Sequence, residues 1–250
     1  GKKAFVGQEI FGKTLGIVGL GAIGKLVANA VLALGMKVIA YDPFVTSTDL
    51  AIELTNNVND VYAKSDYITL HVPATEQTKN SINKNTIALM KDGVRIINLA
   101  RGELVNNEDI KQAIADKKVA KYVTDLPSDD ILGVDGIITI PHLGASTAEA
   151  EDNCAVMAAN QLKDYLENGN VVNSVNFPKL QVERGGKQRI CVVSSSADAV
   201  AKISSSLKDV CNIASATRGS ICYVIADVNT AVDANTLNAI KAGSVSVRVL

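Results

Sequence analysis

A set of polar side chains able to bind anions or transfer protons follows a series of short apolar runs along the chain. Its members are Asp42, His71, Arg101, Asp125 and His142. Each falls at, or within two residues of, the carboxyl end of a predicted strand. The carboxyl ends of parallel strands lie along one edge of a sheet, where open α/β sheets bind their ligands. We therefore expect these residues, distant in sequence, to form one site.

Arg101 and His142 are the members of this set best suited to act on a small acid. The planar guanidinium of Arg101 suits a substrate carboxylate, and its charge can polarise an adjacent carbonyl. His142 can exchange a hydroxyl proton while hydride moves to or from a nicotinamide, because an imidazole titrates near neutral pH. Asp129 and Asp130, on the loop after the fifth predicted strand, are the candidates for the carboxylate that orients His142. Asp125, at the end of that strand, is better placed to meet the nicotinamide carboxamide.

A glycine-rich turn is the reason to expect a dinucleotide cofactor. Gly19, Gly21 and Gly24 follow an apolar run at 15–18 and open a predicted helix. Gly19 permits a tight turn, Gly21 lets the backbone approach a pyrophosphate, and Gly24 lets the helix pack closely on its strand. The first turn of the helix then offers free N–H groups and a positive dipole end to the phosphates.

An acidic residue after the second predicted strand indicates which dinucleotide binds. Asp42 lies 18 residues past Gly24, close to the spacing at which a carboxylate accepts hydrogen bonds from the adenosine ribose hydroxyls. The same acid would repel a 2′-phosphate, so the sequence favours NAD over NADP. Val72 and Pro73 are expected to form a wall against the adenine or ribose, with His71 in a structural role.

Composition limits the classes of partner. With 25 basic and 26 acidic residues the net charge is −1, so no charge excess steers the chain toward nucleic acid or an anionic membrane. No apolar run approaches the roughly 20 residues of a membrane span. The four cysteines form no CxxC pair and no metal-ligand spacing; we expect thiols in a reducing cytoplasm and no metal site.

The order of predicted elements indicates the fold class. Strands are expected at 15–18, 37–41, 67–70, 94–99, 119–124 and 136–140, alternating with helices at 23–34, 85–90, 107–116 and 146–168. This alternation predicts an α/β domain with a doubly wound parallel Rossmann sheet over residues 1–178. A polar, glycine-bearing linker is expected at 179–188. Residues 189–250 follow the order βαββαβ, a small ferredoxin-like domain that is expected to pair with another copy.

Spaced motifs of the first part resemble those of the D-2-hydroxyacid dehydrogenases. The motifs are 19–24, 41–43, 70–73, 98–102 and 141–147, and the βαββαβ part resembles an ACT domain. The resemblance implies NAD-dependent oxidation of 3-phosphoglycerate to 3-phosphohydroxypyruvate, the first step of serine biosynthesis. It implies that Arg101 binds the substrate carboxylate, that His142 is the acid/base, and that Asp130 pairs with His142. The cofactor is expected to contact Gly19, Gly21, Ala22, Ile23, Gly24, Asp42, Val72, Pro73, Leu99, Ala100, Arg101, Asp125, His142, Gly144 and Ala145.

Other expectations concern assembly and departures from the family. The resemblance implies a homodimer through the cofactor domain, with tetramers through the ACT-like domain. Asp130 stands where the family usually has Glu, so a longer or water-bridged pairing with His142 is expected. Residues 194–198 lack the family's usual Asn and Pro or Gly, which favours an assembly module over a serine sensor. The family's first substrate-domain segment is absent, and we hypothesise a truncated, cleaved or partial copy in which 1–12 and the helix after Ser146 face a missing neighbour.

Alternative functions remain open. Another member of the same family, reducing glyoxylate or hydroxypyruvate, is the nearest alternative. A non-catalytic NAD-binding regulatory protein, which keeps the cofactor fold without a substrate domain, is an alternative of a different class.

Overall fold

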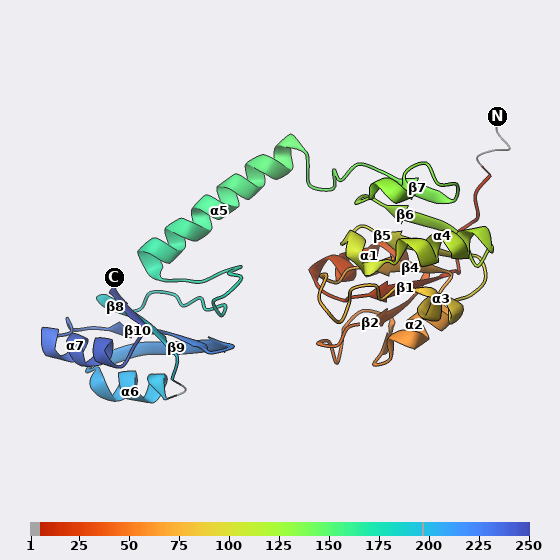
Figure 1. Cartoon of the computed structure of the whole chain (residues 1–250). Helices are drawn as coiled ribbons and strands as arrows, with labels where there is room; N and C mark the ends of the chain where they lie inside the picture. Colours follow the sequence, from red (N-terminus) through yellow and green to blue (C-terminus); the bar gives the residue numbers. More distant parts are fainter. Residues whose placement is uncertain (1–5, 197) are drawn as a thin grey trace. The chain divides into compact units, whose positions relative to one another are not determined.

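The computed structural model describes residues 6–196 and 198–250, which divide into two compact units. The first unit ends at Leu143 and the second begins at Gly144 (Figure 1). This division lies earlier in the chain than the boundary predicted after residue 178. Residues 1–5 and Ala197 lie outside the described residues. The first group begins the segment expected to face a missing neighbour, and Ala197 belongs to the turn expected to lack effector ligands. None of the described helices has both the length and the apolar character needed to cross a bilayer.

The first unit is built on a parallel sheet of seven strands, so the predicted doubly wound Rossmann class is confirmed. The strands are β1 (Thr14–Val18), β2 (Lys37–Tyr41), β3 (Glu53–Thr55), β4 (Tyr67–Leu70), β5 (Val94–Asn98), β6 (Val119–Thr124) and β7 (Ile137–Thr139). Their order in the sheet is β3-β2-β1-β4-β5-β6-β7. The strand order reverses between β1 and β4, and in such sheets the ligand crevice opens at that reversal.

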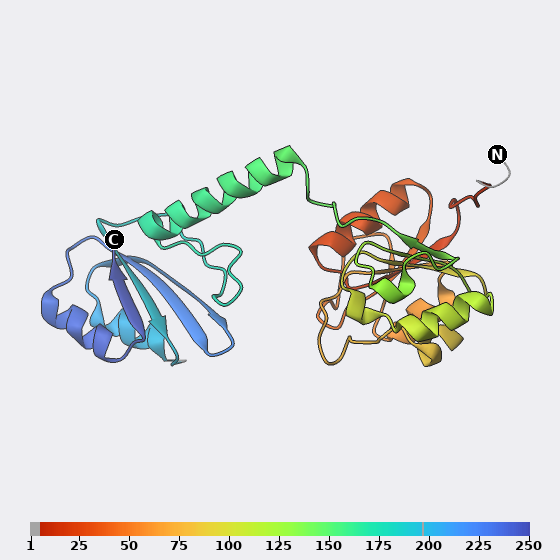
Figure 2. The ribbon, with the colours of Figure 1, turned by 45° about the horizontal axis from the view of Figure 1, so that its top comes forward.

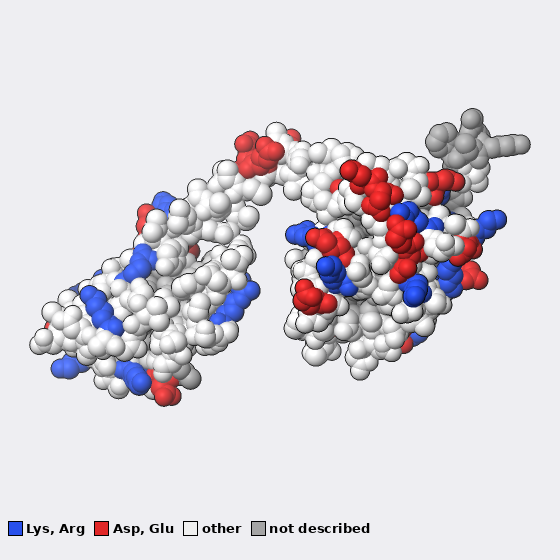
Figure 3. Space-filling model, in the orientation of Figure 1, with Lys and Arg blue, Asp and Glu red and all other residues white. Residues whose placement is uncertain are grey.

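Helices cover both faces of this sheet. They are α1 (Ala22–Ala33), α2 (Val58–Lys64), α3 (Lys84–Ala88) and α4 (Asn107–Ala115). Helix α1 packs on one face through a cluster that includes Ile17 and Ala28, and α2, α3 and α4 lie on the other through a cluster around Ile68 and Ile96 (Figure 2). Acidic and basic side chains are interspersed on the visible face of this unit (Figure 3).

Two elements of the first unit were not expected from the sequence. Strand β3 and helix α2 lie in a polar stretch with only weak helical signals. β3 is a short edge strand that exists through its pairing with β2, where Ile39 lies opposite Glu53. Helix α2 begins after Asn57, whose side chain accepts a hydrogen bond from the Asn59 N–H, and buries Val61 against the sheet.

The second unit contains the predicted βαββαβ order. Its elements are α5 (Ala148–Asn168), β8 (Gln188–Ser194), α6 (Ala199–Ser206), β9 (Val210–Arg218), β10 (Ile221–Val228), α7 (Ala234–Ala242) and β11 (Ser246–Val249). The four strands form an antiparallel sheet in the order β11-β8-β10-β9. This is the arrangement of the split βαβ folds.

Both faces of the four-stranded sheet are covered by the unit's own chain. Helices α6 and α7 pack on one face through residues such as Ile203 and Ile240. The segment that follows α5 covers the other face, where Phe177 and Leu180 pack with Tyr223. The stretch predicted as a linker, residues 179–188, therefore lies along the sheet and contributes to this second apolar cluster.

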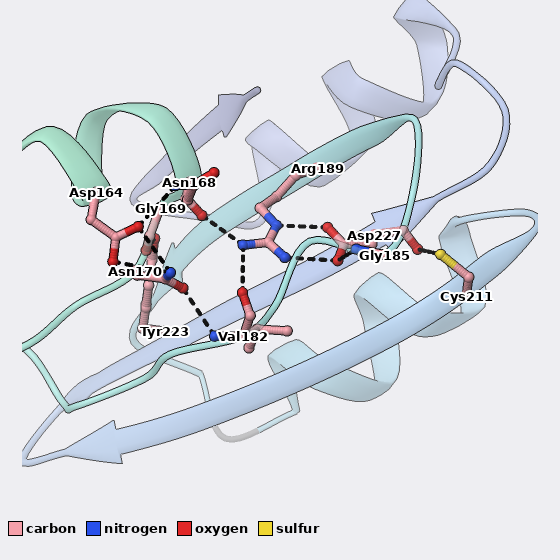
Figure 4. Close-up of polar contacts among 10 residues, drawn as sticks. All are labelled: Asp164, Asn168, Gly169, Asn170, Val182, Gly185, Arg189, Cys211, Tyr223 and Asp227. Atoms are coloured by element: carbon pink, nitrogen blue, oxygen red, sulfur yellow. Dashed lines mark hydrogen bonds and ion pairs between the residues drawn. The ribbon is translucent and has the colours of Figure 1, made fainter.

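A fully buried ion pair fastens that segment to the sheet (Figure 4). Arg189 on β8 donates from Nε to Oδ1 of Asp227 on β10 over 2.6 Å and from Nη2 to Oδ2 over 2.8 Å. Its Nη1 donates to the carbonyls of Asn168 and Val182, and the Gly185 N–H donates to Asp227. Burial opposes the charged form of Asp227, but the hydrogen bonds from Arg189 and Gly185 hold its pKa below its usual value.

Replacing Arg189 should destabilise the second unit strongly. Arg189→Met leaves the Asp227 carboxylate buried without its cation, and breaking such a pair typically costs about 3–5 kcal/mol of unfolding free energy. Urea unfolding followed by circular dichroism measures the change. Lys64→Met, which removes the exposed pair with Glu53, is the matched control and should leave the unfolding curve unchanged. An unfolding curve of Arg189→Met that is as unchanged as that of the control would show that the buried pair is dispensable.

Candidate active site

The turn between β1 and α1 is shaped by glycines with different requirements. Gly19 has φ +98°, and a Cβ there would lie 2.5 Å from the carbonyl oxygen of His71. A Cβ on Gly24 would collide with the carbonyl oxygen of Gly19. A Cβ on Gly21 would meet no atom within 4 Å. The fold therefore requires glycine at 19 and 24, while the space beside Gly21 is open to a ligand.

The first turn of α1 presents unpaired N–H groups to this opening. Gly21 is the N-cap residue, no side chain in the described part of the chain caps it, and the first turn contains no acidic residue. The first hydrogen bond of the helix runs from the Lys25 N–H to the Gly21 carbonyl over 3.0 Å. The N–H groups of Ala22 and Ile23 therefore lie at the positive end of the helix dipole, ready to bind an anion such as a pyrophosphate.

Asp42 lies directly beside the glycine turn. Its Oδ2 accepts a hydrogen bond from the Leu20 N–H over 2.8 Å, and its Oδ1 accepts one from the Phe44 N–H over 2.9 Å. Each carboxylate oxygen keeps a further lone pair for a hydroxyl donor. A crevice lined by Asp42, Pro43 and Thr55 opens next to it. The arrangement fits the ribose role, which stays a prediction.

His142 is paired with Asp125 at the opposite part of the same edge. The imidazole Nδ1 lies 2.9 Å from Asp125 Oδ2. Asp125 is nearly buried, and its other oxygen, Oδ1, is buried with no hydrogen-bond partner in the part of the chain that the structure describes. Buried carboxylate oxygens are rarely left unpaired, so Oδ1 fits an N–H donor from a ligand, as the amide of a nicotinamide would supply.

Asp130 makes no direct hydrogen bond to His142 among the described residues, and the expected longer or water-bridged pairing stays a prediction. The Asp130 carboxylate accepts hydrogen bonds from Ser128 Oγ over 2.6 Å and from Asn107 Nδ2 over 3.1 Å, and it lies 3.4 Å from Lys111 Nζ. The hydrogen bond from Ser128 and, to a smaller extent, the hydrogen bond and charge of Lys111 hold the pKa of Asp130 below its usual value. The one-turn 3₁₀ segment Asp129–Ile131 thus directs Asp130 toward α4, and Asp125 holds the imidazole instead.

Arg101 lies on the surface at the start of the 3₁₀ turn Gly102–Leu104. Its guanidinium makes one hydrogen bond among the described residues, from Nη1 to the Ala100 carbonyl. The side chain is therefore available to a substrate carboxylate.

Sequence reasoning missed the fully buried Asn98, which holds the main chain of this turn. The available signal was a polar residue at the end of an apolar strand, just before Arg101.

Among the remaining predicted residues, the contacts of His71 fit its expected structural role, whereas the expected cofactor contacts are not tested. His71 Nε2 lies 3.1 Å from Thr69 Oγ1, and burial lowers the pKa of the His71 imidazole, in keeping with a structural role. Val72 packs beside Gly19, and Leu99 is partly exposed at the end of β5. The predicted cofactor contacts at Pro73, Leu99, Ala100, Gly144 and Ala145 stay predictions.

The chain resembles characterised proteins over most of its length. Residues 1–144 match the family model described as "D-isomer specific 2-hydroxyacid dehydrogenase, NAD binding domain". The D-3-phosphoglycerate dehydrogenase of Methanocaldococcus jannaschii is 37% identical over 195 residues, which are 74% of this chain and 37% of that protein. The hydroxypyruvate reductase of Thermotoga maritima is 45% identical over 159 residues, 60% of this chain and 52% of that protein. The chain thus spans about a third to a half of the length of these relatives.

Solved structures of related enzymes share the fold. A glyoxylate reductase from Paecilomyes thermophila superposes with a TM-score of 0.63 at 29% identity, covering 68% of this chain and 54% of that one. An NAD-dependent formate dehydrogenase from Staphylococcus aureus, in complex with NAD, gives a TM-score of 0.59 at 26% identity, covering 66% of this chain and 52% of that one.

Alanine substitutions in the glycine turn should separate binding from folding. Gly21→Ala has room for its methyl group, so the melting temperature should not change, but the group occupies the space expected for the pyrophosphate and should weaken NADH binding about tenfold or more. Gly24→Ala forces the turn apart and should also lower the unfolding free energy by about 1–3 kcal/mol. Fluorescence titration with NADH and thermal melting measure both effects. Unchanged NADH affinity in Gly21→Ala would contradict this assignment.

Proposed function

The chain belongs to the NAD-binding domain family of the D-isomer specific 2-hydroxyacid dehydrogenases, and from this premise we propose that it serves the NAD-dependent oxidation of a 2-hydroxy acid, or the reverse reduction. The observation that carries the proposal is the 2.9 Å contact between His142 and Asp125, whose second oxygen is buried and has no hydrogen-bond partner among the described residues. A histidine paired with a carboxylate can move a hydroxyl proton. The unpaired oxygen suits the amide of a nicotinamide.

Binding of the cofactor falls to residues along the edge of the sheet. The N–H groups at the start of α1 would hold the pyrophosphate, and Asp42 would hold the ribose hydroxyls. Asp125 Oδ1 would accept an N–H of the carboxamide. NAD, when bound, supplies the hydride acceptor, and the chain's own side chains supply the substrate binding and the proton transfer.

The proposed chemistry assigns one task to each remaining side chain. Arg101 binds the substrate carboxylate and keeps the carbon that bears the hydroxyl in a fixed orientation. With Nδ1–H donating to Asp125, Nε2 of His142 carries the lone pair that accepts the hydroxyl proton. The hydrogen on that carbon leaves with its electron pair as hydride, and the C–O bond becomes a carbonyl. Asp125 stabilises the imidazolium that forms.

We propose 3-phosphoglycerate as the substrate, with the chain acting in the first step of serine biosynthesis. Relatives named D-3-phosphoglycerate dehydrogenase from Methanocaldococcus jannaschii and Synechocystis, 37% and 40% identical, support this choice. We interpret the βαββαβ part as an ACT-like assembly module, which would extend a homodimer to a tetramer. Hydroxypyruvate is the second candidate, favoured by the 45% identity to the Thermotoga maritima enzyme.

Steady-state assays on the protein that the gene encodes test the proposed substrate. A higher kcat/KM for 3-phosphoglycerate, measured as NADH formation, than for hydroxypyruvate or glyoxylate, measured as NADH consumption, supports 3-phosphoglycerate as the substrate. A higher kcat/KM for hydroxypyruvate supports the second candidate. NADH binding without turnover of any of these acids would favour the regulatory alternative and contradict the proposed function.

The two aspartates near His142 should differ sharply in their effect on catalysis. Asp125→Asn keeps the shape of the side chain but cannot stabilise an imidazolium, so kcat/KM should fall about a hundredfold or more. Asp130→Asn should stay within a few-fold of the unsubstituted protein, because Asp130 is bonded to Ser128, Asn107 and Lys111. Steady-state kinetics of both variants give the comparison. An equally large loss in Asp130→Asn would mean that Asp130 pairs with His142 in the working enzyme.

A further inference from the structure

Asn98 is a fully buried polar residue at the end of a largely apolar strand. It ends β5, its side chain is fully buried, and it lies in register between Leu70 on β4 and Thr124 on β6. Ile96, two residues earlier on the same strand face, belongs to the apolar core cluster. A buried amide is retained at little cost only when its donors and acceptor are paired, so the partners of Asn98 indicate its task.

The Asn98 amide is hydrogen-bonded to main-chain groups of Ala100 and Arg101. Nδ2 donates to the carbonyl of Arg101 over 2.8 Å, and Oδ1 accepts from the Ala100 N–H over 3.2 Å. A carbonyl can only accept and a peptide N–H can only donate, so these partners fix which way the amide faces. The side chain therefore closes a small loop that forces the chain from Asn98 to Arg101 into one conformation.

A second donor acts on the same carbonyl. The Leu104 N–H donates to the Arg101 carbonyl over 3.3 Å. The main chain of Arg101 is thus held from two sides, while its guanidinium is exposed and bonded only to the Ala100 carbonyl among the described residues. The base of the side chain is fixed and its charged end is available.

Tyr122 supports the amide from the neighbouring strand. Its hydroxyl lies 3.3 Å from Asn98 Nδ2. Burial raises the pKa of the Tyr122 phenol, so the hydroxyl stays protonated and neutral at ordinary pH. It therefore accepts the second N–H of the amide without placing a charge beneath Arg101.

We propose that Asn98 is a positioning residue that aims Arg101 at the substrate carboxylate, an inference that rests on the proposed function of Arg101. Asn98 touches neither substrate nor cofactor and acts only through the Arg101 main chain. Because a substrate must be held to within about half an ångström for efficient transfer, loss of this support should reduce substrate binding more than NADH binding.

A double-mutant cycle on the full-length protein tests the proposal. In Asn98→Asp an oxygen replaces Nδ2 and faces the Arg101 carbonyl, so the KM for the 2-hydroxy acid should rise about tenfold or more. NADH affinity should stay within twofold. In an Arg101→Lys background the same change should have little further effect on KM, because the residue through which Asn98 acts is already altered. Tyr122→Phe removes one hydrogen bond from the amide but leaves both of its main-chain bonds, so it should raise KM by less than threefold.

Additive effects of Asn98→Asp and Arg101→Lys would overturn the proposal, as would a loss of NADH affinity equal to the rise in KM. If Asn98→Asp does not fold, Asn98→Ala removes the same hydrogen bonds without burying a charge and takes its place in the cycle.

A measurement that needs no activity separates this proposal from the proposed function. Exchange of the Ala100 and Leu104 amide hydrogens should be about tenfold faster in the Asn98 variant than in the unsubstituted protein, and it should be accelerated much less in Tyr122→Phe, which keeps both main-chain bonds of the amide. Unchanged exchange in the Asn98 variant would overturn the proposal. A protein that turns over no 2-hydroxy acid but shows the faster exchange would lose the proposed function and keep the role of Asn98.

Discussion

The parallel pairing of β1, β4, β5 and β6 is the constraint on which the site depends. Parallel strands bring their carboxyl ends to one edge, and here the four ends are followed by the glycine turn, His71, the Arg101 turn and Asp125. Val18 lies in register with Leu70, and Leu70 with Asn98, which in turn lies opposite Thr124. The glycine turn, the Arg101 turn and Asp125 are therefore brought to the same edge although more than a hundred residues separate the first from the last.

Residues along this edge divide into those that the fold uses and those that it leaves available. The fold uses Gly19 and Gly24, because a side chain at either would collide with backbone. It leaves the space beside Gly21 empty, the guanidinium of Arg101 exposed and Asp125 Oδ1 unpaired. A buried polar group without a partner costs stability unless a ligand pairs with it, and open space beside a helix N-terminus is a suitable place for an anion. The occurrence of both features along one edge supports a dinucleotide site.

In the second unit a buried ion pair holds a polar segment against the sheet. Arg189 joins the end of α5, the segment after it and two strands of the sheet through hydrogen bonds to Asn168, Val182 and Asp227. A buried pair of this kind contributes little net stability relative to apolar packing, but it is costly to break. Its value here is that a polar, glycine-bearing segment is held in one path along the sheet.

The sequence by itself determined the cofactor turn and the order of the elements. The strand, the glycines and the helix of residues 14–33 depend on neighbours in the chain, so composition and spacing were sufficient to predict them. The edge strand β3 was not predictable in this way, because its three residues form a strand only by pairing with β2. The partner of His142 was likewise decided by tertiary structure: Asp125 and Asp130 are alike in chemistry and close in sequence, but Lys111 and Asn107 on α4 engage Asp130 and leave Asp125 to the imidazole. Local sequence fixes which groups are available, and only the packing of distant elements decides which of them meet.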